Sequence, residues 1–80
     1  MINETNKNEV MRKLKYFLDE KIPVHFSEYD GTFHNGILKD LVVDENLVVI
    51  VDRKDGMDII TAEDIVADSI AVVKEEQKDA

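Results

Sequence analysis

Two histidines and a group of acidic residues are the side chains of this 80-residue chain that could do chemistry. His25 and His34 flank the Asp30-Gly31 pair, which predicts a hairpin with a two-residue loop. In that register Ser27 lies opposite His34 and His25 lies opposite Gly36, so the two rings are offset. A histidine pair can bind a metal or act as acid and base, but no cysteine or third histidine completes a ligand set. The sequence therefore predicts solvent-facing histidines, no catalytic residues and no enzymatic activity.

Four acidic side chains fall within one twelve-residue window, the length of a calcium-binding loop: Asp52, Asp55, Asp58 and Glu63. Such a loop needs oxygen ligands at its third and fifth positions and a glycine at its sixth. Here Lys54 occupies the third position, Gly56 the fifth and Met57 the sixth. The window therefore predicts a solvated turn, with no metal site and no cofactor.

Residues 6–20 have the pattern of one amphipathic helix. Asn6 is expected to be the N-cap, with Glu9 at the spacing of a capping box. Five apolar side chains fall within an arc of about 120°, enough for one buried face: Val10, Met11, Leu14, Phe17 and Leu18. The helix is expected to end before Pro23, because the residue preceding a proline is disfavoured in helical conformation.

Five short strands are predicted after the helix, at residues 24–29, 32–43, 46–52, 57–61 and 69–73, with a helical turn at 62–64. Gly36 interrupts the second strand, as at the bulges and bends of small barrels. The third strand is apolar at five consecutive positions, so we expect both its faces to be covered, one by the barrel interior and the other by the helix or a neighbouring subunit.

These elements predict a mainly β fold, in which an N-terminal α-helix precedes a five-stranded antiparallel SH3-like barrel, because closure removes exposed strand edges. The expected organisation is a flexible N-terminus at residues 1–5, one helix-plus-barrel domain at 6–75, and a polar tail at 76–80.

The charge and composition of the chain limit which classes of partner it can bind. The net charge is −8: residues 1–22 carry five basic and four acidic side chains (+1), and residues 23–80 carry five basic and fourteen acidic ones (−9). The acidic part repels a phosphate backbone, so non-specific binding to DNA is not expected. Without cysteines, a signal sequence or a long apolar run, the chain is expected to be cytoplasmic and not bound to a membrane.

The spacing of Gly31, Gly36, Leu38 and Asn46-Leu47-Val48 resembles the first motif of the Sm-like family, and residues 65–70 resemble its second motif more weakly. The resemblance covers about residues 8–52. It implies an Sm-like barrel and self-association into a homo-oligomer such as a ring, in which the fourth and fifth strands pair with neighbouring copies.

The resemblance also implies single-stranded RNA as a partner. Sm-like proteins hold a uridine-type base with a stacking side chain, an Asn and an Arg. Asn46 matches the Asn, Asp44 stands where the stacking side chain would be, and Val66-Ala67 replaces Arg-Gly. Asp68 and Ser69 are expected to line the same loops, so the predicted RNA-binding residues are Asn46, Asp44, Asp68 and Ser69.

Two functions from different classes follow. The first is an Sm-like barrel that self-assembles and acts as a scaffold or a narrowly specific RNA-binding protein. The alternative is an acidic SH3-like adaptor that binds a basic protein segment without RNA. The charge of −9 over residues 23–80 supports this alternative. A regulator that mimics nucleic acid through its acidic surface is a third alternative.

Overall fold

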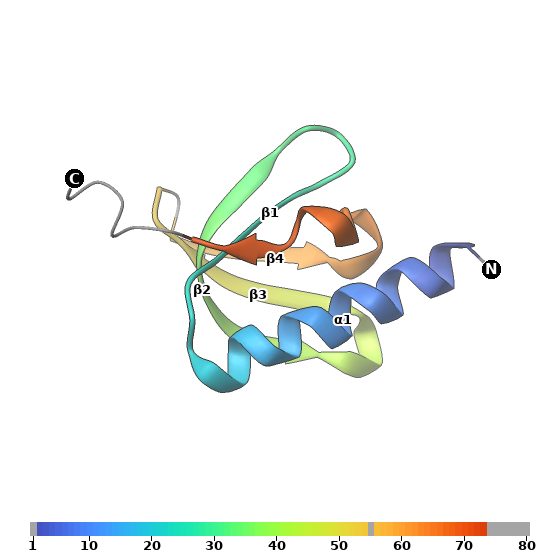
Figure 1. Ribbon diagram of the computed structural model, residues 1–80, viewed down its shortest axis with the longest axis horizontal. Coiled ribbons are helices and arrows are strands. Elements are labelled where there is room, and N and C mark those ends of the chain that lie inside the picture. The colour runs from blue at the N-terminus through green and yellow to red at the C-terminus, as the bar shows by residue number, and fades with distance from the viewer. Residues whose placement is uncertain (1, 55, 74–80) are drawn as a thin grey trace.

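The computed structural model describes residues 2–54 and 56–73, in which one helix is followed by five antiparallel strands and three 3-10 turns (Figure 1). The helix is α1 (Ile2–Glu20). The strands are β1 (Val24–Ser27), β2 (Phe33–Val42), β3 (Leu47–Asp52), β4 (Gly56–Thr61) and β5 (Ala71–Val72). The 3-10 turns are η1 (Val43–Glu45), η2 (Ala62–Asp64) and η3 (Ala67–Ser69). The predicted polar tail at 76–80 lies outside the described residues.

The helix α1 begins at Ile2, four residues before the expected start. Asn6 is therefore not the N-cap, and that prediction is wrong. Its side chain instead reaches out of the helix, where Nδ2 donates to the Ile65 carbonyl at 2.9 Å and Oδ1 accepts from the Tyr29 hydroxyl at 3.2 Å. These contacts fix the N-terminal half of the helix to the segment after β4 and to the β1–β2 loop.

The helix ends where the sequence predicts, but proline is not the whole reason. Lys21 has φ +57°, and its N–H donates to the Leu18 carbonyl at 3.3 Å. The N–H of Ile22 donates to the Phe17 carbonyl at 3.1 Å. This pair of bonds is a Schellman motif, which satisfies carbonyl groups at the helix end before Pro23 is reached.

The five strands form one open sheet in the order β4-β3-β2-β1-β5. Within the described residues, β4 pairs with β3 and the two-residue β5 pairs with β1, so β4 and β5 form opposite edges that do not meet. The predicted closed barrel is therefore wrong, and the fold is α+β, one helix with a five-stranded antiparallel sheet. The order of elements is consistent with an Sm-like topology.

The core lies between α1 and one face of the sheet, here called the inner face. Helix residues of the predicted apolar face contribute Val10, Leu14 and Phe17. The strands and the segment after β4 contribute Val24, Phe26, Leu38, Val48, Ile50, Ile60, Ala62, Ile65 and Ala67. Figure 1 shows α1 lying along one side of the sheet, where its contacts are mainly with β2, η2 and η3.

Gly36 sits where three strands meet. It pairs with β1 on one side and with Asp52 of β3 on the other, and an added Cβ would overlap the carbonyl oxygen of Val51. Of the bulge or bend expected at Gly36, the bulge is not at the glycine, because the register shift of β2 falls between Leu38 and Asp40. The absence of a side chain at Gly36 therefore permits the close approach of β3.

Candidate functional site

The position of His34 depends on the register of the first hairpin, which differs from the predicted one. The Glu28 N–H donates to the Thr32 carbonyl at 2.7 Å, so the loop has three residues and Phe26, not Ser27, lies opposite His34. A shift of one residue turns every side chain of a strand to the other face. His34 therefore points inward and is only 6% exposed, and the prediction of a solvent-facing side chain is wrong for this histidine. His25 pairs with Asn35 and is half-buried.

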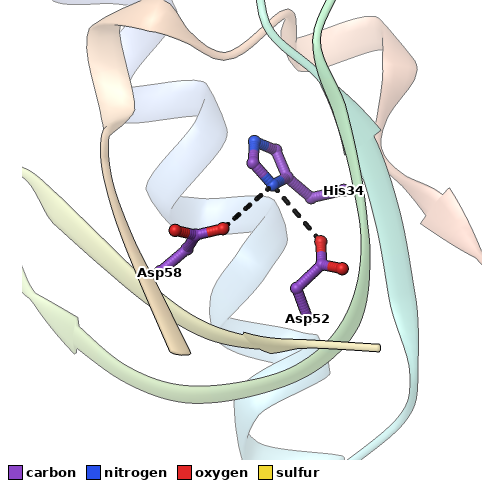
Figure 2. A group of neighbouring side chains, drawn as sticks. All are labelled: His34, Asp52 and Asp58. Carbon is purple, nitrogen blue, oxygen red and sulfur yellow. Dashed lines mark ion pairs between the residues drawn. The ribbon is translucent and has the colours of Figure 1, made fainter. Parts of the chain in front are cut away.

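Three carboxylates surround the His34 ring. Nε2 lies 2.7 Å from Glu28 Oε2, and Nδ1 lies 3.4 Å from Asp52 Oδ2 and 3.8 Å from Asp58 Oδ2. Figure 2 shows the carboxylates of Asp52 and Asp58 converging on Nδ1 from β3 and β4. We call Glu28, His34, Asp52 and Asp58 the His34 cluster. Of the other acidic residues in the twelve-residue window, Glu63 lies in η2 and pairs with Lys7, and Asp55 lies outside the described residues.

The two ring nitrogens of His34 have different surroundings. At the 2.7 Å contact a Glu28 carboxylate can only accept a hydrogen bond, which assigns the donated hydrogen to Nε2. Nδ1 is buried and has no hydrogen-bond partner among the described residues, although it faces two carboxylate oxygens. A neutral ring would therefore direct a lone pair at two negative groups, which is unfavourable without a positive charge between them.

The Asp52 carboxylate is held in place by the backbone. Oδ1 accepts a hydrogen bond from the Lys54 N–H at 2.8 Å, and Oδ2 accepts one from the Asn35 N–H at 3.4 Å. The close approach of β3 at Gly36 brings this carboxylate beside β2. The Asp58 side chain is 37% exposed, so the His34 cluster reaches solvent at this residue.

A second acidic feature lies next to the His34 cluster. A hollow of about 230 Å³ is lined by Glu28, Tyr29, Asp30 and Asp64. The Thr32 N–H donates to Asp30 Oδ1 at 2.9 Å, and this bond lowers the pKa of the Asp30 carboxyl, with a smaller contribution from the Thr32 side chain. The hollow therefore carries negative charge at neutral pH, and its chemistry suits a cationic group.

The predicted RNA-binding residues occupy two separate turns. Asp44 lies in η1 and is exposed. Asn46 is the residue directly after η1 and has φ +57°. Asp68 and Ser69 lie in η3. No side-chain hydrogen bond joins the two pairs in the part of the chain that the structure describes. The turns are connected through η2, where the Ala62 N–H donates to the Asn46 carbonyl at 2.8 Å.

Ser69 has a structural role in this arrangement. Its hydroxyl donates to the Val66 carbonyl at 2.6 Å and accepts a hydrogen bond from the Ser27 N–H at 2.8 Å. The bond from Ser27 ties the η3 segment to β1, and the two bonds together occupy the Ser69 hydroxyl. RNA contact by Asn46, Asp44 and Asp68 stays a prediction, and Ser69 would contribute mainly by shaping the loop.

Sequence reasoning missed the His34 cluster because its members come from distant parts of the chain. A signal was available in the alternation of the strands. Asp52 stands two residues after the buried Ile50, and Asp58 stands two residues before the buried Ile60. Because residues at i and i+2 share one face of a strand, both aspartates could have been assigned to the inner face.

No protein-family model matches this chain, and no curated protein and no solved structure is significantly similar to it. No helix in residues 2–54 and 56–73 combines the length and the apolar character needed to cross a membrane. The features available for assigning a function are therefore the open sheet, its two edges and the clusters of charged side chains.

Proposed function

We propose that this chain is an Sm-like domain that self-associates through the two edges of its open sheet and serves as a scaffold or a narrowly specific RNA-binding protein. The observation that carries the proposal is the position of β4 and β5 at opposite edges of one antiparallel sheet. Pairing β4 of one copy with β5 of the next is a head-to-tail contact, and such contacts generate rings when the rotation closes.

Exposed apolar side chains beside the β4 edge support self-association. On the outer face of the sheet, Ile37, Val51 and Met57 lie opposite one another across three strands, and Ile59 follows on β4. Met57 is 60% exposed and Ile59 is 64% exposed. We call Ile37, Val51, Met57 and Ile59 the outer patch. Contiguous apolar surface of this kind marks interaction sites on monomers.

The outer patch also revises the expectation for the third strand. Its inner side chains, Val48 and Ile50, are fully buried, while Val51 on the outer face is exposed. The helix α1 packs on the inner face together with the rest of the core, so it does not cover both sides of β3. A neighbouring copy is then the remaining candidate to cover the outer face.

Assembly is tested by native mass spectrometry of the full chain, with Ile59→Lys as the disrupting variant and Val43→Lys as the matched control. Both residues are exposed and apolar, but Val43 lies in η1, between β2 and β3, and not on an edge strand. A charge on an edge strand opposes edge-to-edge pairing. We expect a closed oligomer for the wild type and Val43→Lys, and monomers for Ile59→Lys. A monomeric wild type would overturn the proposal.

RNA binding is tested separately, by adding a short uridine-rich RNA to the same samples. We propose that Asn46 contacts the base, because it holds the left-handed position at the end of η1 and matches the Asn of the family motif. Asn46→Ala is expected to abolish RNA binding while the oligomer persists. A tight RNA complex of the Asn46→Ala chain would refute this assignment.

A second candidate function, an acidic adaptor for a basic protein segment, is favoured by the hollow lined by Glu28, Tyr29, Asp30 and Asp64. A lysine or arginine side chain entering it would meet three carboxylates. Binding of a cationic peptide would then weaken steeply with added salt and would be reduced by Asp64→Asn. A monomer that binds such a peptide and ignores RNA would favour this function over the first.

A further inference from the structure

We propose that His34, Asp52 and Asp58 form a binding site for a divalent first-row transition-metal ion, with Glu28 orienting the histidine. The ligands would be His34 Nδ1 and one carboxylate oxygen from each aspartate. This site lies on the inner face of the sheet, whereas the proposed function uses the outer patch and the RNA-binding turns, although Asp58 belongs to the edge strand β4. Its ligand atoms all lie within 4.8 Å of one another.

The distances between the ligand atoms fit a small cation. Zinc binds imidazole nitrogen and carboxylate oxygen at about 2.0–2.2 Å, so two ligands of a tetrahedral ion are about 3.3–3.6 Å apart. Nδ1 lies 3.4 Å from Asp52 Oδ2 and 3.8 Å from Asp58 Oδ2. The first distance falls in this range and the second slightly exceeds it, while the two carboxylate oxygens lie within 4.8 Å of each other, so metal binding would draw the partly exposed Asp58 side chain inward.

The unpartnered nitrogen of His34 points to a ligand. The His34 side chain is 93% buried, and its Nδ1 faces Asp52 and Asp58 without forming a hydrogen bond. A buried polar atom that lacks a partner costs free energy, and a lone pair facing two carboxylates adds repulsion. A divalent cation between the three atoms removes both costs and balances the two negative charges.

The surroundings of the three ligands resemble the outer shell of known metal sites. A metal-bound histidine commonly donates its other ring N–H to a carboxylate, which fixes the ring and its tautomer. Glu28 accepts this hydrogen bond from Nε2 at 2.7 Å, and so leaves Nδ1 for the metal. The backbone N–H groups of Asn35 and Lys54 orient the Asp52 carboxylate in the same way.

The chemical types of the three ligand atoms determine which metal ions the site can bind. One imidazole nitrogen with two carboxylates suits zinc, manganese, iron or cobalt, whereas calcium and magnesium prefer oxygen ligands alone. Three protein ligands leave at least one coordination position for water. The exposed part of Asp58 gives the ion a path from solvent.

The test is calorimetric titration of the untagged full chain, first treated with EDTA, with Zn²⁺. Asp58→Asn removes one ligand at a half-buried position, and Asp40→Asn makes the same charge change at an exposed position of β2. We expect Asp58→Asn to weaken Zn²⁺ binding at least tenfold and Asp40→Asn to change it less than twofold. Equal affinities for the wild type and Asp58→Asn would overturn the proposal.

The role of Glu28 is tested by Glu28→Gln, which removes the charge and keeps an oxygen acceptor for the His34 N–H. Substitution of an outer-shell partner weakens metal binding by about 10–100-fold, and we expect a loss within this range. His25→Asn controls for the other histidine and is expected to leave binding unchanged. If His25→Asn abolished binding instead, the ion would belong to a surface site and the proposal would fail.

Nitrogen-15 NMR of the histidine rings distinguishes a metal from a proton. With Zn²⁺ bound, His34 is expected to show a protonated Nε2 and a large shift of the metal-bound Nδ1. A metal-free chain in which both nitrogens are protonated, and which does not change on addition of Zn²⁺, would show that a proton neutralises the cluster. That result would overturn the proposal without requiring any variant to fold.

Discussion

The two ends of the sheet's inner face are chemically opposite. At one end the inward residues of β2, β3 and β4 are Leu38, Ile50 and Ile60, all buried under α1. At the other end the inward residues of the same strands are His34, Asp52 and Asp58. His34 and Asp52 are as buried as the core side chains. On the inner face, each of these strands thus has an apolar residue toward one end and an ionisable residue toward the other.

This difference separates what stabilises the fold from what is available for function. Burial of Ile50 or Ile60 stabilises the folded state through the hydrophobic effect. Burial of charged groups costs free energy unless they are paired, and apolar residues of similar volume are often at least as stabilising. The apolar end is therefore explained by folding, whereas the His34 cluster is the part of the inner face for which we propose a bound ion.

The largest expected effect is at the apolar end. Ile50→Ala removes a fully buried side chain from the centre of the core and is expected to lower the free energy of unfolding by about 2–5 kcal/mol. Val43→Ala, an exposed apolar position in η1 outside the outer patch, is the control and is expected to cost well under half as much. Urea denaturation measures both. Equal losses would mean that burial of Ile50 does not account for the stability of the core.

At the polar end, stability is expected to depend on the ion. A ligand that binds only the folded state at a hundredfold excess over its Kd stabilises that state by about 2.7 kcal/mol. Zn²⁺ at such an excess should therefore raise the free energy of unfolding of the wild type by this amount, and EDTA should reverse the change. In Asp58→Asn, binding at least tenfold weaker should leave a gain of about 1.4 kcal/mol or less at the same Zn²⁺ concentration. An equal gain in Asp58→Asn would place the ion elsewhere.

Gly36 lies at the boundary between the two ends, and its substitution tests whether they are coupled. In Gly36→Ala the new Cβ would overlap the Val51 carbonyl, so β3 must move away from β2. Overpacking of this kind costs about 1–3 kcal/mol. Because Asp52 follows Val51, we also expect weaker Zn²⁺ binding, measured by the same titration. A chain that lost stability but kept its affinity for Zn²⁺ would show that the two ends are independent.

Sequence patterns predicted the features that depend on local periodicity. The buried face of α1, including Val10, Leu14 and Phe17, follows from spacing alone. The first hairpin was harder, because Asp-Gly also fits a three-residue loop with the glycine in the left-handed region, and Gly31 has φ +97°. The observed register differs from the predicted one by a single residue, and this difference places His34 on the inner face instead of the outer face.

The His34 cluster and the open sheet required the three-dimensional arrangement. Asp58 reaches His34 only through the combined registers of β2 with β3 and β3 with β4, which no local pattern specifies. The count of five strands predicted a barrel, but closure depends on the length of the edge strands. With two residues in β5, the described sheet stays open.

The smallest expected effect concerns Asp30, in the loop beside the His34 cluster. Its pKa is lowered below the ordinary value of 3.8, first by the Thr32 backbone N–H, then by the Thr32 side chain, and least by the charge of His34. A carboxyl with a lowered folded pKa contributes stability that is present above pH 3.8 and is lost as the pH falls through the folded value. Carbon-13 NMR titration should show Thr32→Val raising the pKa of Asp30 more than His34→Gln does. The opposite order would mean that the loop's electrostatics are set by the polar end of the sheet, and not by its own turn.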